Sequence, residues 1–278
     1  MTDVEAKIIE IEKQIAGMGS IAVAVSGGID SMTLAGLANR ANDRVTIYHA
    51  ISPAVPQQAT RRVKDLASER KWSLVSLDAK EFSDEDYLAN PVDRCFFCKS
   101  NLYRAISERT KDPILSGTNK DDLSDYRPGL DAAKQLNVRH PFAENGVRKP
   151  VIRLIAKLIG MNHLSEMPAS PCLSSRIETG IRIDPVLLPL INEAEILVKK
   201  MMLNESSTVR CRVRPSGIVI ELDKLSLESL TQNVTELLVE QLSAIFQGIG
   251  YSQPIAFELY ELGSAFIKIN ANSIGLRA

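Results

Sequence analysis

The stretch that decides the fold is Ser26-Gly27-Gly28-Ile29-Asp30-Ser31, which follows the apolar run Ile21-Ala22-Val23-Ala24-Val25. A helical pattern comes next, so the sequence predicts a strand, a glycine turn and the start of a helix. Two adjacent glycines let the backbone turn sharply and approach a ligand. The hydroxyl groups of Ser26 and Ser31, together with the free N–H groups of a helix N-terminus, can donate to phosphate. The turn therefore predicts a phosphate site.

The turn matches neither the Walker pattern nor the dinucleotide-binding glycine pattern. It resembles the PP-loop of ATP pyrophosphatases, which cleave ATP between the α and β phosphates and adenylate a substrate oxygen. The alternative interpretation is a tight connection that binds nothing. Asp30 argues against it, because a carboxylate beside a phosphate is repulsive unless a divalent cation lies between them. We therefore expect Mg²⁺ and ATP at residues 26–31.

The composition is that of an ordinary globular protein, with 45% hydrophobic and 24% charged residues in a chain of 278. There are 33 basic and 34 acidic side chains, so the net charge of −1 argues against a nucleic-acid partner. Residues 2–17 read as an amphipathic helix and not as a signal peptide, and no apolar run reaches transmembrane length. Four cysteines without a secretion signal indicate a reducing, cytoplasmic environment.

The first part of the chain alternates strand and helix patterns. We expect strands at 21–25, 45–50, 74–77 and 113–116, with helices near 32–41, 57–71 and 97–110. This alternation predicts an α/β fold with a parallel sheet whose ligands bind at the carboxyl ends of the strands. Gly117, which follows the last of these strands, and the loop Asp125-Tyr126-Arg127-Pro128-Gly129 should line the same crevice as the glycine turn.

The pattern changes after residue 170. We expect a PP-loop domain over residues 1–170 and a smaller α+β domain over residues 171–278. In the second domain a helix should run from Pro185 to near Leu203, followed by a hairpin of 208–214 and 218–222. A helix near 225–247 and a strand at 255–260 should complete it.

The cysteines suggest a second chemistry. Cys95 and Cys98 form a Cys-x-x-Cys, which fits a redox dithiol, half of a zinc site or two of three ligands to an iron–sulfur cluster. Cys172 is the third candidate. Cys211 alternates with arginines and should point with the neighbouring valines into a core, so we interpret it as structural. None of the three histidines has a metal-ligand spacing.

Two groups of basic side chains suggest sites for a thiolate and for an anion. Arg176 follows Cys172 closely enough in sequence to lower the pKa of its thiol. Arg210, Arg212 and Arg214 fall on one face of their strand, where forked donors suit carboxylate or phosphate. The alternative is a solvated edge strand, which we favour for Arg214 alone.

Several motifs occur in one order and together resemble the LarE family: 26–31, 94–99, 117–129, Lys149 with Ile152-Arg153, and 171–176. LarE proteins are PP-loop (adenine nucleotide alpha hydrolase-like) sulfurtransferases that make the nickel-pincer nucleotide cofactor of lactate racemase. The resemblance covers about residues 10–222. It implies that ATP adenylates a carboxylate of pyridinium-3,5-biscarboxylic acid mononucleotide and that sulfur then displaces AMP to leave a thiocarboxylate.

The resemblance also implies roles for individual residues. ATP should be bound by Ser26, Gly27, Gly28, Asp30, Ser31 and Gly117. The nucleotide substrate should be held by Ser175, Arg176, Arg210 and Arg212, with Glu221 in a nearby cation site. Cys172, Asp30 and Arg176 should take part in catalysis. Members with the cysteine of position 172 alone sacrifice its sulfur, whereas those with all three cysteines are thought to hold a [4Fe-4S] cluster on Cys95, Cys98 and Cys172.

Other functions fit parts of the sequence. A tRNA-thiolating PP-loop enzyme also combines ATP with cysteines, although the near-zero charge argues against it. An ammonia-using synthetase would not need the three cysteines, and a nucleotide-binding scaffold would not turn ATP over. From the resemblance we expect a sulfur donor as a partner, and we expect a homo-oligomer.

Overall fold

The computed structural model describes residues 2–124, 127–168, 170–202, 208–250, 254–261 and 263–264. The chain divides into two compact units, one of Met1–Tyr87 with Asp93–Cys172 and the other of Leu88–Val92 with Leu173–Ala278. The short segment 88–92 belongs to the second unit because of hydrogen bonds that no local pattern indicates. Asn90 accepts from the N–H of Gly180 at 2.9 Å and donates through its side chain to the carbonyls of Glu178 and Ile181, both at 2.9 Å.

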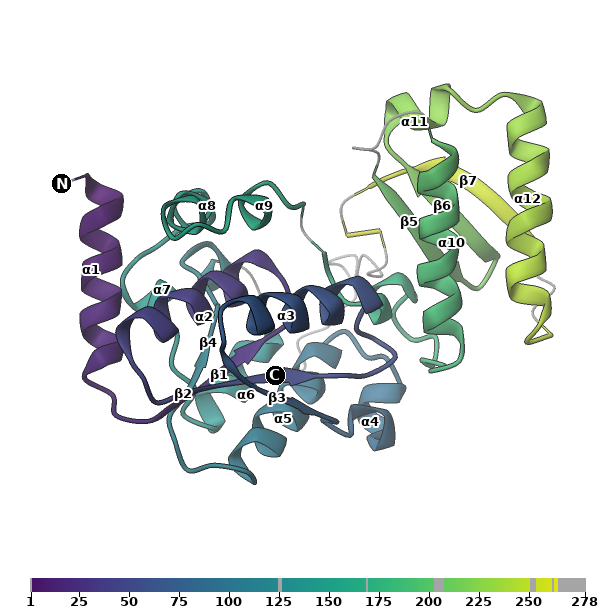
Figure 1. Ribbon diagram of the computed structural model, residues 1–278. Coiled ribbons are helices and arrows are strands. Elements are labelled where there is room, and N and C mark those ends of the chain that lie inside the picture. The colour runs from purple at the N-terminus through teal and green to yellow at the C-terminus, as the bar shows by residue number, and fades with distance from the viewer. Residues whose placement is uncertain are drawn as a thin grey trace, which may run out of the picture. The chain divides into compact units, whose positions relative to one another are not determined.

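The first unit has the predicted α/β fold, with a four-stranded parallel sheet in the order β3-β2-β1-β4. The strands are β1 (Ile21–Val25), β2 (Val45–Ala50), β3 (Ser73–Leu77) and β4 (Ile114–Ser116). Its longer helices are α1 (Asp3–Ala16), α2 (Ile29–Ala41), α3 (Gln57–Glu69), α5 (Arg94–Ser107), α6 (Pro128–Gln135) and α8 (Lys149–Leu158), and its short ones are α4 (Glu85–Leu88), α7 (Pro141–Glu144) and α9 (Asn162–Ser165). Figure 1 shows helices on both sides of the sheet.

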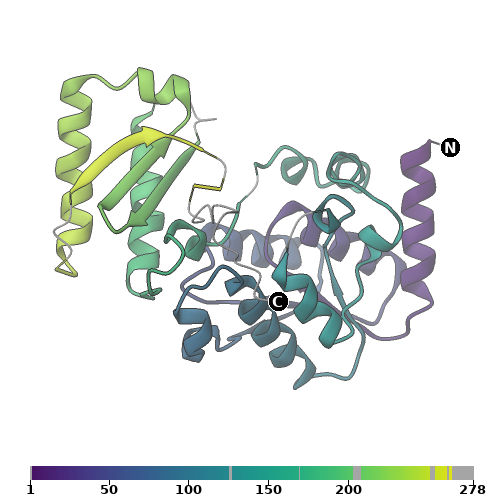
Figure 2. The same cartoon turned by 180° about the vertical axis from the view of Figure 1, so that it is seen from behind.

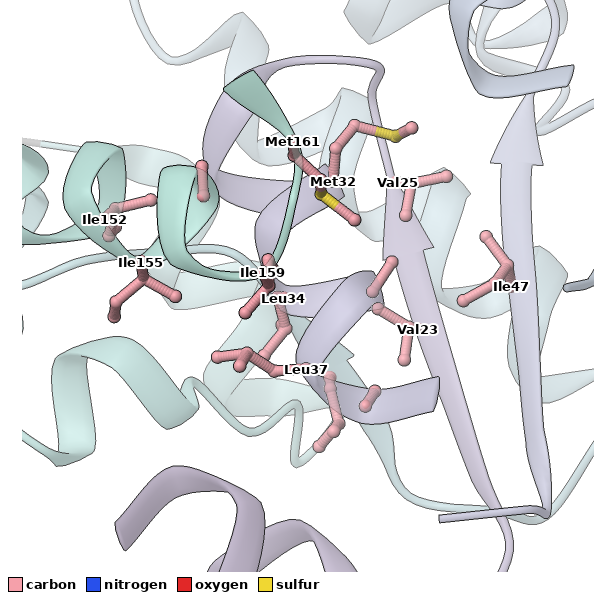
Figure 3. Close-up of a cluster of buried hydrophobic side chains, with 14 of the residues drawn as sticks. Val23, Val25, Met32, Leu34, Leu37, Ile47, Ile152, Ile155, Ile159 and Met161 are labelled. Carbon is pink, nitrogen blue, oxygen red and sulfur yellow. The ribbon is translucent and has the colours of Figure 1, made fainter. Parts of the chain in front are cut away.

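The alternation of side chains along β1 builds two cores, one on each face of the sheet. Ile21, Val23 and Val25 belong to a cluster with α1, α2, α3 and α8, whereas Ala22 and Ala24 belong to a cluster with α5 and α6. Figure 3 shows the first cluster, where side chains of α2 lie between the strands and α8. The strand is buried along its whole length, as expected for the middle of a parallel sheet.

The second unit is the predicted smaller α+β domain. Strands β5 (Val209–Arg214) and β6 (Gly217–Leu222) form the predicted antiparallel hairpin, and β7 (Ile255–Leu259) pairs with β6 in parallel. Helix α10 (Leu187–Met201) packs against β5 and against α12 (Gln232–Gln247). Figure 2 shows this sheet and its helices from the opposite side.

The prediction of a single helix over 225–247 was wrong. The structure has α11 (Lys224–Glu228) and then α12, with Thr231 in an extended conformation between them. The Thr231 side chain accepts a hydrogen bond from the N–H of Val234, which is the role of a helix N-cap. The local cap therefore starts a new helix inside a stretch whose apolar pattern looks continuous. None of the helices in the described ranges has both the length and the apolar character needed to cross a membrane.

Candidate functional site

The glycine turn lies at the point where the order of the strands in the sheet reverses direction. From β1 the chain builds β2 and β3 on one side, and then returns to place β4 on the other side of β1. In parallel α/β sheets this switch point opens a crevice at the carboxyl ends of the two central strands. Residues 26–31 follow β1 and Gly117 follows β4, so the fold puts both predicted phosphate-site segments at the same end of the sheet, where this crevice is expected.

Hydrogen bonds inside the turn fix its shape. The Ser31 hydroxyl accepts from the N–H of Ser26 at 3.1 Å and donates to the carbonyl of Gly28 at 3.1 Å. Gly28 is the N-cap of α2, and no side chain caps this helix within the described chain. The first N–H groups of α2 are therefore left for an anion, which the positive end of the helix dipole also favours.

The two glycines of the crevice are required by close contacts. Gly27 has φ +81°, and a side-chain carbon there would lie 2.8 Å from the carbonyl oxygen of Ala59. At Gly117 such a carbon would lie 2.6 Å from the backbone nitrogen of Ser31. The loop after β4 thus packs directly on the first turn of α2, and only glycine fits between them.

Asp30 lies in this crevice and has a cation as its partner. Its Oδ2 accepts from Nζ of Lys149 at 2.6 Å, while its buried Oδ1 has no hydrogen-bond partner among the described residues. Burial raises the pKa of Asp30, and the Lys149 ammonium opposes that shift. A carboxylate with an unused buried oxygen favours a second positive charge, which fits the expected Mg²⁺.

Lys149 is held in place by the loop after β4. Its backbone N–H donates to Oδ2 of Asp121 at 2.9 Å, and Arg148 donates to Oδ1 of the same carboxylate at 3.1 Å. The N–H of Asp121 in turn donates to Oδ1 of Asn119, a residue that is 2% exposed. A continuous set of hydrogen bonds therefore links the end of β4 to the start of α8. In the loop 125–129, Asp125 and Tyr126 lie outside the described residues.

The Cys-x-x-Cys lies in the first turns of α5, earlier than the helix predicted from residue 97. The three-residue spacing puts both thiols on one side of the helix. Cys172 is close to them, because its charge raises the pKa of Cys95 and of Cys98. The three cysteines predicted as cluster ligands therefore lie in the same region of the first unit. Within the described ranges, no three His, Cys, Asp or Glu side chains are close enough to hold a single metal ion.

Protein packed around the two thiols raises the pKa of both. Cys95 is an exposed residue, yet its thiol is surrounded by enough protein that lost hydration, followed by the charge of Cys172, raises its pKa. Burial raises the pKa of Cys98 to about 12. A redox dithiol and a metal ligand both use the thiolate, and these shifts oppose its formation until a cation is bound. Cys211 is fully buried in the second unit, as predicted for a structural residue.

Lys99 lies among the cysteines, and sequence reasoning missed it. Burial acts to lower the pKa of Lys99, but the negative charges of Tyr103 and of Cys98, Cys95 and Cys172 outweigh burial and raise it. Its Nζ is 6.0 Å from the centre of the Tyr103 ring. The sequence could have indicated this residue, because a lysine that directly follows a Cys-x-x-Cys lies in the same helical turn as the second cysteine.

We expected the arginines of the second unit to offer their guanidinium groups to a ligand, but two of them are already paired with a carboxylate of the protein. Arg212 is 6% exposed, donates from Nε to Glu221 at 2.8 Å and donates to the carbonyl of Ser175 at 2.8 Å. Arg214 donates to the other oxygen of Glu221 at 2.6 Å. Glu221 is thus the buried counter-ion of two arginines, and an ion pair stands where we expected a cation site.

Arg176 is also paired. Its Nε and one terminal nitrogen donate to the two oxygens of Glu195 at 2.9 and 3.0 Å, and Glu195 also accepts from the N–H of Cys211. Its other terminal nitrogen donates to the hydroxyl of Ser175 at 3.0 Å. These contacts fix the guanidinium plane and leave Ser175 beside it.

Arg210 is the arginine of this strand without a carboxylate partner in the described residues. It donates to the carbonyl of Val209 at 2.8 Å and lies 5.8 Å from the ring of Tyr260. Burial lowers the pKa of Arg210, and the neighbouring Arg176 adds to that shift. Like charges in one place attract an anion, so Arg210 fits the predicted anion site better than Arg212 does.

Arg62 was also missed by sequence reasoning. It donates to the carbonyl of Gly27 at 2.6 Å and orients that peptide of the glycine turn. It is on α3, 35 residues further along the chain. No local motif connects these positions, so only the packing of α3 beside β1 reveals the contact.

Comparison with known proteins finds several that are similar to this chain over most of its length. It is 30% identical over 254 residues to an uncharacterised protein of Synechocystis, covering 89% of this chain and 91% of that protein. This chain belongs to the family of that cyanobacterial protein. It is 26% identical to an uncharacterised protein of Methanocaldococcus jannaschii, over 86% of this chain and 90% of that protein. No family model matches the sequence.

A third relative carries a functional name. The chain is 26% identical over 208 residues to the pyridinium-3,5-bisthiocarboxylic acid mononucleotide synthase of Lactiplantibacillus plantarum, over 73% of this chain and 74% of that enzyme. This likeness supports the LarE resemblance drawn from the motifs.

Proposed function

We propose that this protein is an ATP-dependent sulfurtransferase of the LarE type that acts on pyridinium-3,5-biscarboxylic acid mononucleotide. The observation that carries the proposal is the combination within one unit of a PP-loop at the sheet's switch point and three neighbouring cysteines. The likeness to the Lactiplantibacillus enzyme supports the same substrate class. A protein that only binds nucleotide would need the first feature without the second.

The crevice residues suit the activation step. The N–H groups at the start of α2 and the glycine turn would hold the phosphates, and Asp30 would hold Mg²⁺. A carboxylate oxygen of the substrate attacks the α phosphorus, the bond between that phosphorus and the bridging oxygen breaks, and pyrophosphate leaves with the electron pair. The carboxyl carbon then carries AMP as a good leaving group.

The cysteine group suits delivery of sulfur. The proposal of a [4Fe-4S] cluster is supported by three cysteines, Cys95, Cys98 and Cys172, whose charges act on one another within the first unit. A [4Fe-4S] cluster held there would supply sulfide through the iron that no cysteine binds. Cys95, Cys98 and Cys172 would hold it, and the Lys99 ammonium would offset the negative charge that gathers there. In the product a carbon–sulfur bond replaces the bond between carbon and the AMP oxygen.

The second unit offers groups for the substrate's own anions. Arg210, which has no carboxylate partner in the described residues, and Ser175 beside the fixed Arg176 would bind carboxylate or phosphate. Arg212 would act indirectly, since its bond to the carbonyl of Ser175 positions that residue. This division assigns binding to Arg210 and positioning to Arg212.

The test is anaerobic reconstitution with iron and sulfide, followed by incubation with Mg²⁺, ATP and the dicarboxylate nucleotide. We expect about four irons per chain, AMP and pyrophosphate in equal amounts, and the thiocarboxylate by mass spectrometry. Cys95→Ser, Cys98→Ser and Cys172→Ser should each lose iron, whereas Cys211→Ala is the matched control that keeps it. Full activity without iron, with dehydroalanine at position 172, would overturn the cluster part of the proposal.

A further inference from the structure

The ion pair between Lys149 and Asp30 is a contact between distant parts of the chain. Asp30 is in the first turn of α2 and Lys149 is the first residue of α8, yet Nζ and Oδ2 are 2.6 Å apart. Both side chains are partly exposed, at 34% for Lys149 and 21% for Asp30. The pair is therefore open to solutes and is not a sealed core contact.

The lysine occupies one of the two oxygens that a metal ion would use. Oδ1 of Asp30 is buried and has no hydrogen-bond partner in the described ranges, so the lysine is bonded to one carboxylate oxygen and the other oxygen lacks a hydrogen bond. A divalent cation bound to either oxygen of this carboxylate would lie close to the Lys149 ammonium and repel it. Binding of the cation at Asp30 must weaken the hold on Lys149.

The backbone of Lys149 stays fixed when its side chain is released. Its N–H is bonded to Asp121, and Asp121 is bonded through Asn119 to the loop that contains Gly117. That loop packs on the backbone of Asp30 and Ser31. The four-carbon side chain of Lys149 is then tethered beside the start of α2, where the glycine turn offers its N–H groups to an anion.

We propose that Lys149 serves as the stand-in cation of Asp30 when no metal is bound, and that Mg²⁺ displaces its ammonium onto the phosphates of ATP, where it becomes a phosphate-binding residue. This inference rests on the proposed ATP site and adds a role that the sequence motifs did not assign. It gives a role to the hydrogen bond between the Lys149 N–H and the Asp121 carboxylate, because this bond fixes the backbone from which the lysine side chain extends. The exchange keeps Asp30 neutralised both before and after nucleotide binding.

The test compares the full-length protein with Lys149→Met, using Mn²⁺ as the metal probe and the α,β-methylene analogue of ATP, which cannot be cleaved. Without nucleotide, Mn²⁺ binding measured by electron paramagnetic resonance should become about fivefold tighter in Lys149→Met, because a competing cation is gone. Adding Asp30→Asn should abolish that gain. With Mn²⁺ present, affinity for the ATP analogue should fall about tenfold, because the ammonium no longer reaches the phosphates.

The opposite signs of the two effects separate this role from a structural one. A variant that merely loosened the crevice would weaken both metal and nucleotide binding. Lys157→Met is the matched control, since it removes a lysine of the same helix that pairs with Glu166 at the exposed surface. It should change neither affinity by more than twofold.

Two results would overturn the inference. One is unchanged or weaker Mn²⁺ binding in Lys149→Met, and the other is an unchanged affinity for the ATP analogue. Neither measurement uses the pyridinium substrate or the iron–sulfur cluster. If both predicted shifts appear while the reconstituted protein forms no thiocarboxylate, the proposed substrate is wrong and the cation exchange stands.

Discussion

Replacing Gly117 by alanine tests whether the close approach of two loops creates the nucleotide site. The new Cβ would lie 2.6 Å from the nitrogen of Ser31 and 2.7 Å from the carbonyl carbon of Asp30. Both are backbone atoms of the first turn of α2, so no side-chain rotation can relieve the overlap. The separation must widen to about 3.4 Å before the contact becomes ordinary.

The magnitude follows from that displacement. Forcing one extra carbon into a packed site costs about 1–3 kcal/mol. For a unit of this size the melting temperature should fall by about 2–12 °C. The displaced turn also carries the N–H groups that would face the phosphates, so affinity for the ATP analogue should fall by about tenfold or more. Thermal unfolding and equilibrium binding of the analogue measure the two effects.

Gly17→Ala is the matched control. Gly17 has φ −78°, and an added carbon would lie no closer than 3.6 Å to the carbonyl oxygen of Gln14. This substitution should leave nucleotide affinity unchanged and should keep or slightly raise the melting temperature, because alanine restricts the unfolded chain. If Gly117→Ala matched Gly17→Ala in both measurements, the packing argument for the crevice would be refuted.

Three further predictions concern other parts of the molecule. The bonds from Arg139 lower the pKa of Glu144 to about 2, so Glu144 stabilises the fold fully above its ordinary value near 4.5 and loses that contribution as the pH falls toward 2. Glu144→Gln should therefore lower the free energy of unfolding at pH 6 and leave it almost unchanged near pH 2, as measured by urea titration. Arg212→Ala should destabilise the second unit by about 3 kcal/mol, because Glu221, 1% exposed, loses one of its two arginines. It should weaken binding of the dicarboxylate nucleotide and spare ATP affinity, and equal losses of both in calorimetry would contradict the assignment. Thr231→Ala removes the cap of α12 and should cost about 1 kcal/mol, which chemical denaturation of the variant and its Thr231→Ser counterpart would detect.

The sequence predicted the order of elements in the first unit because their signals are local. An apolar run of five residues before two glycines defines β1, and the strand predicted at 45–50 matches β2 at both ends. The helix predicted at 225–247 was wrong for a reason that is also local, because the cap at Thr231 interrupts a continuous apolar pattern. Periodicity detects a buried face, whereas a cap depends on one side chain.

The sequence by itself determined which groups are available for the proposed chemistry: a glycine turn with Asp30 for phosphate, and the cysteines Cys95, Cys98 and Cys172 for sulfur. These features are local in sequence, so their residue types and spacing are enough to recognise them. Tertiary structure decided which groups are partners. It brought Lys149 to Asp30 across 119 residues, enclosed Arg212 with Glu221, and left Arg210 without a carboxylate in the described residues. Charged groups pair according to their distance in space and to the free-energy cost of burying a charge without a partner. Neither the distance nor that cost can be read from the order of the residues.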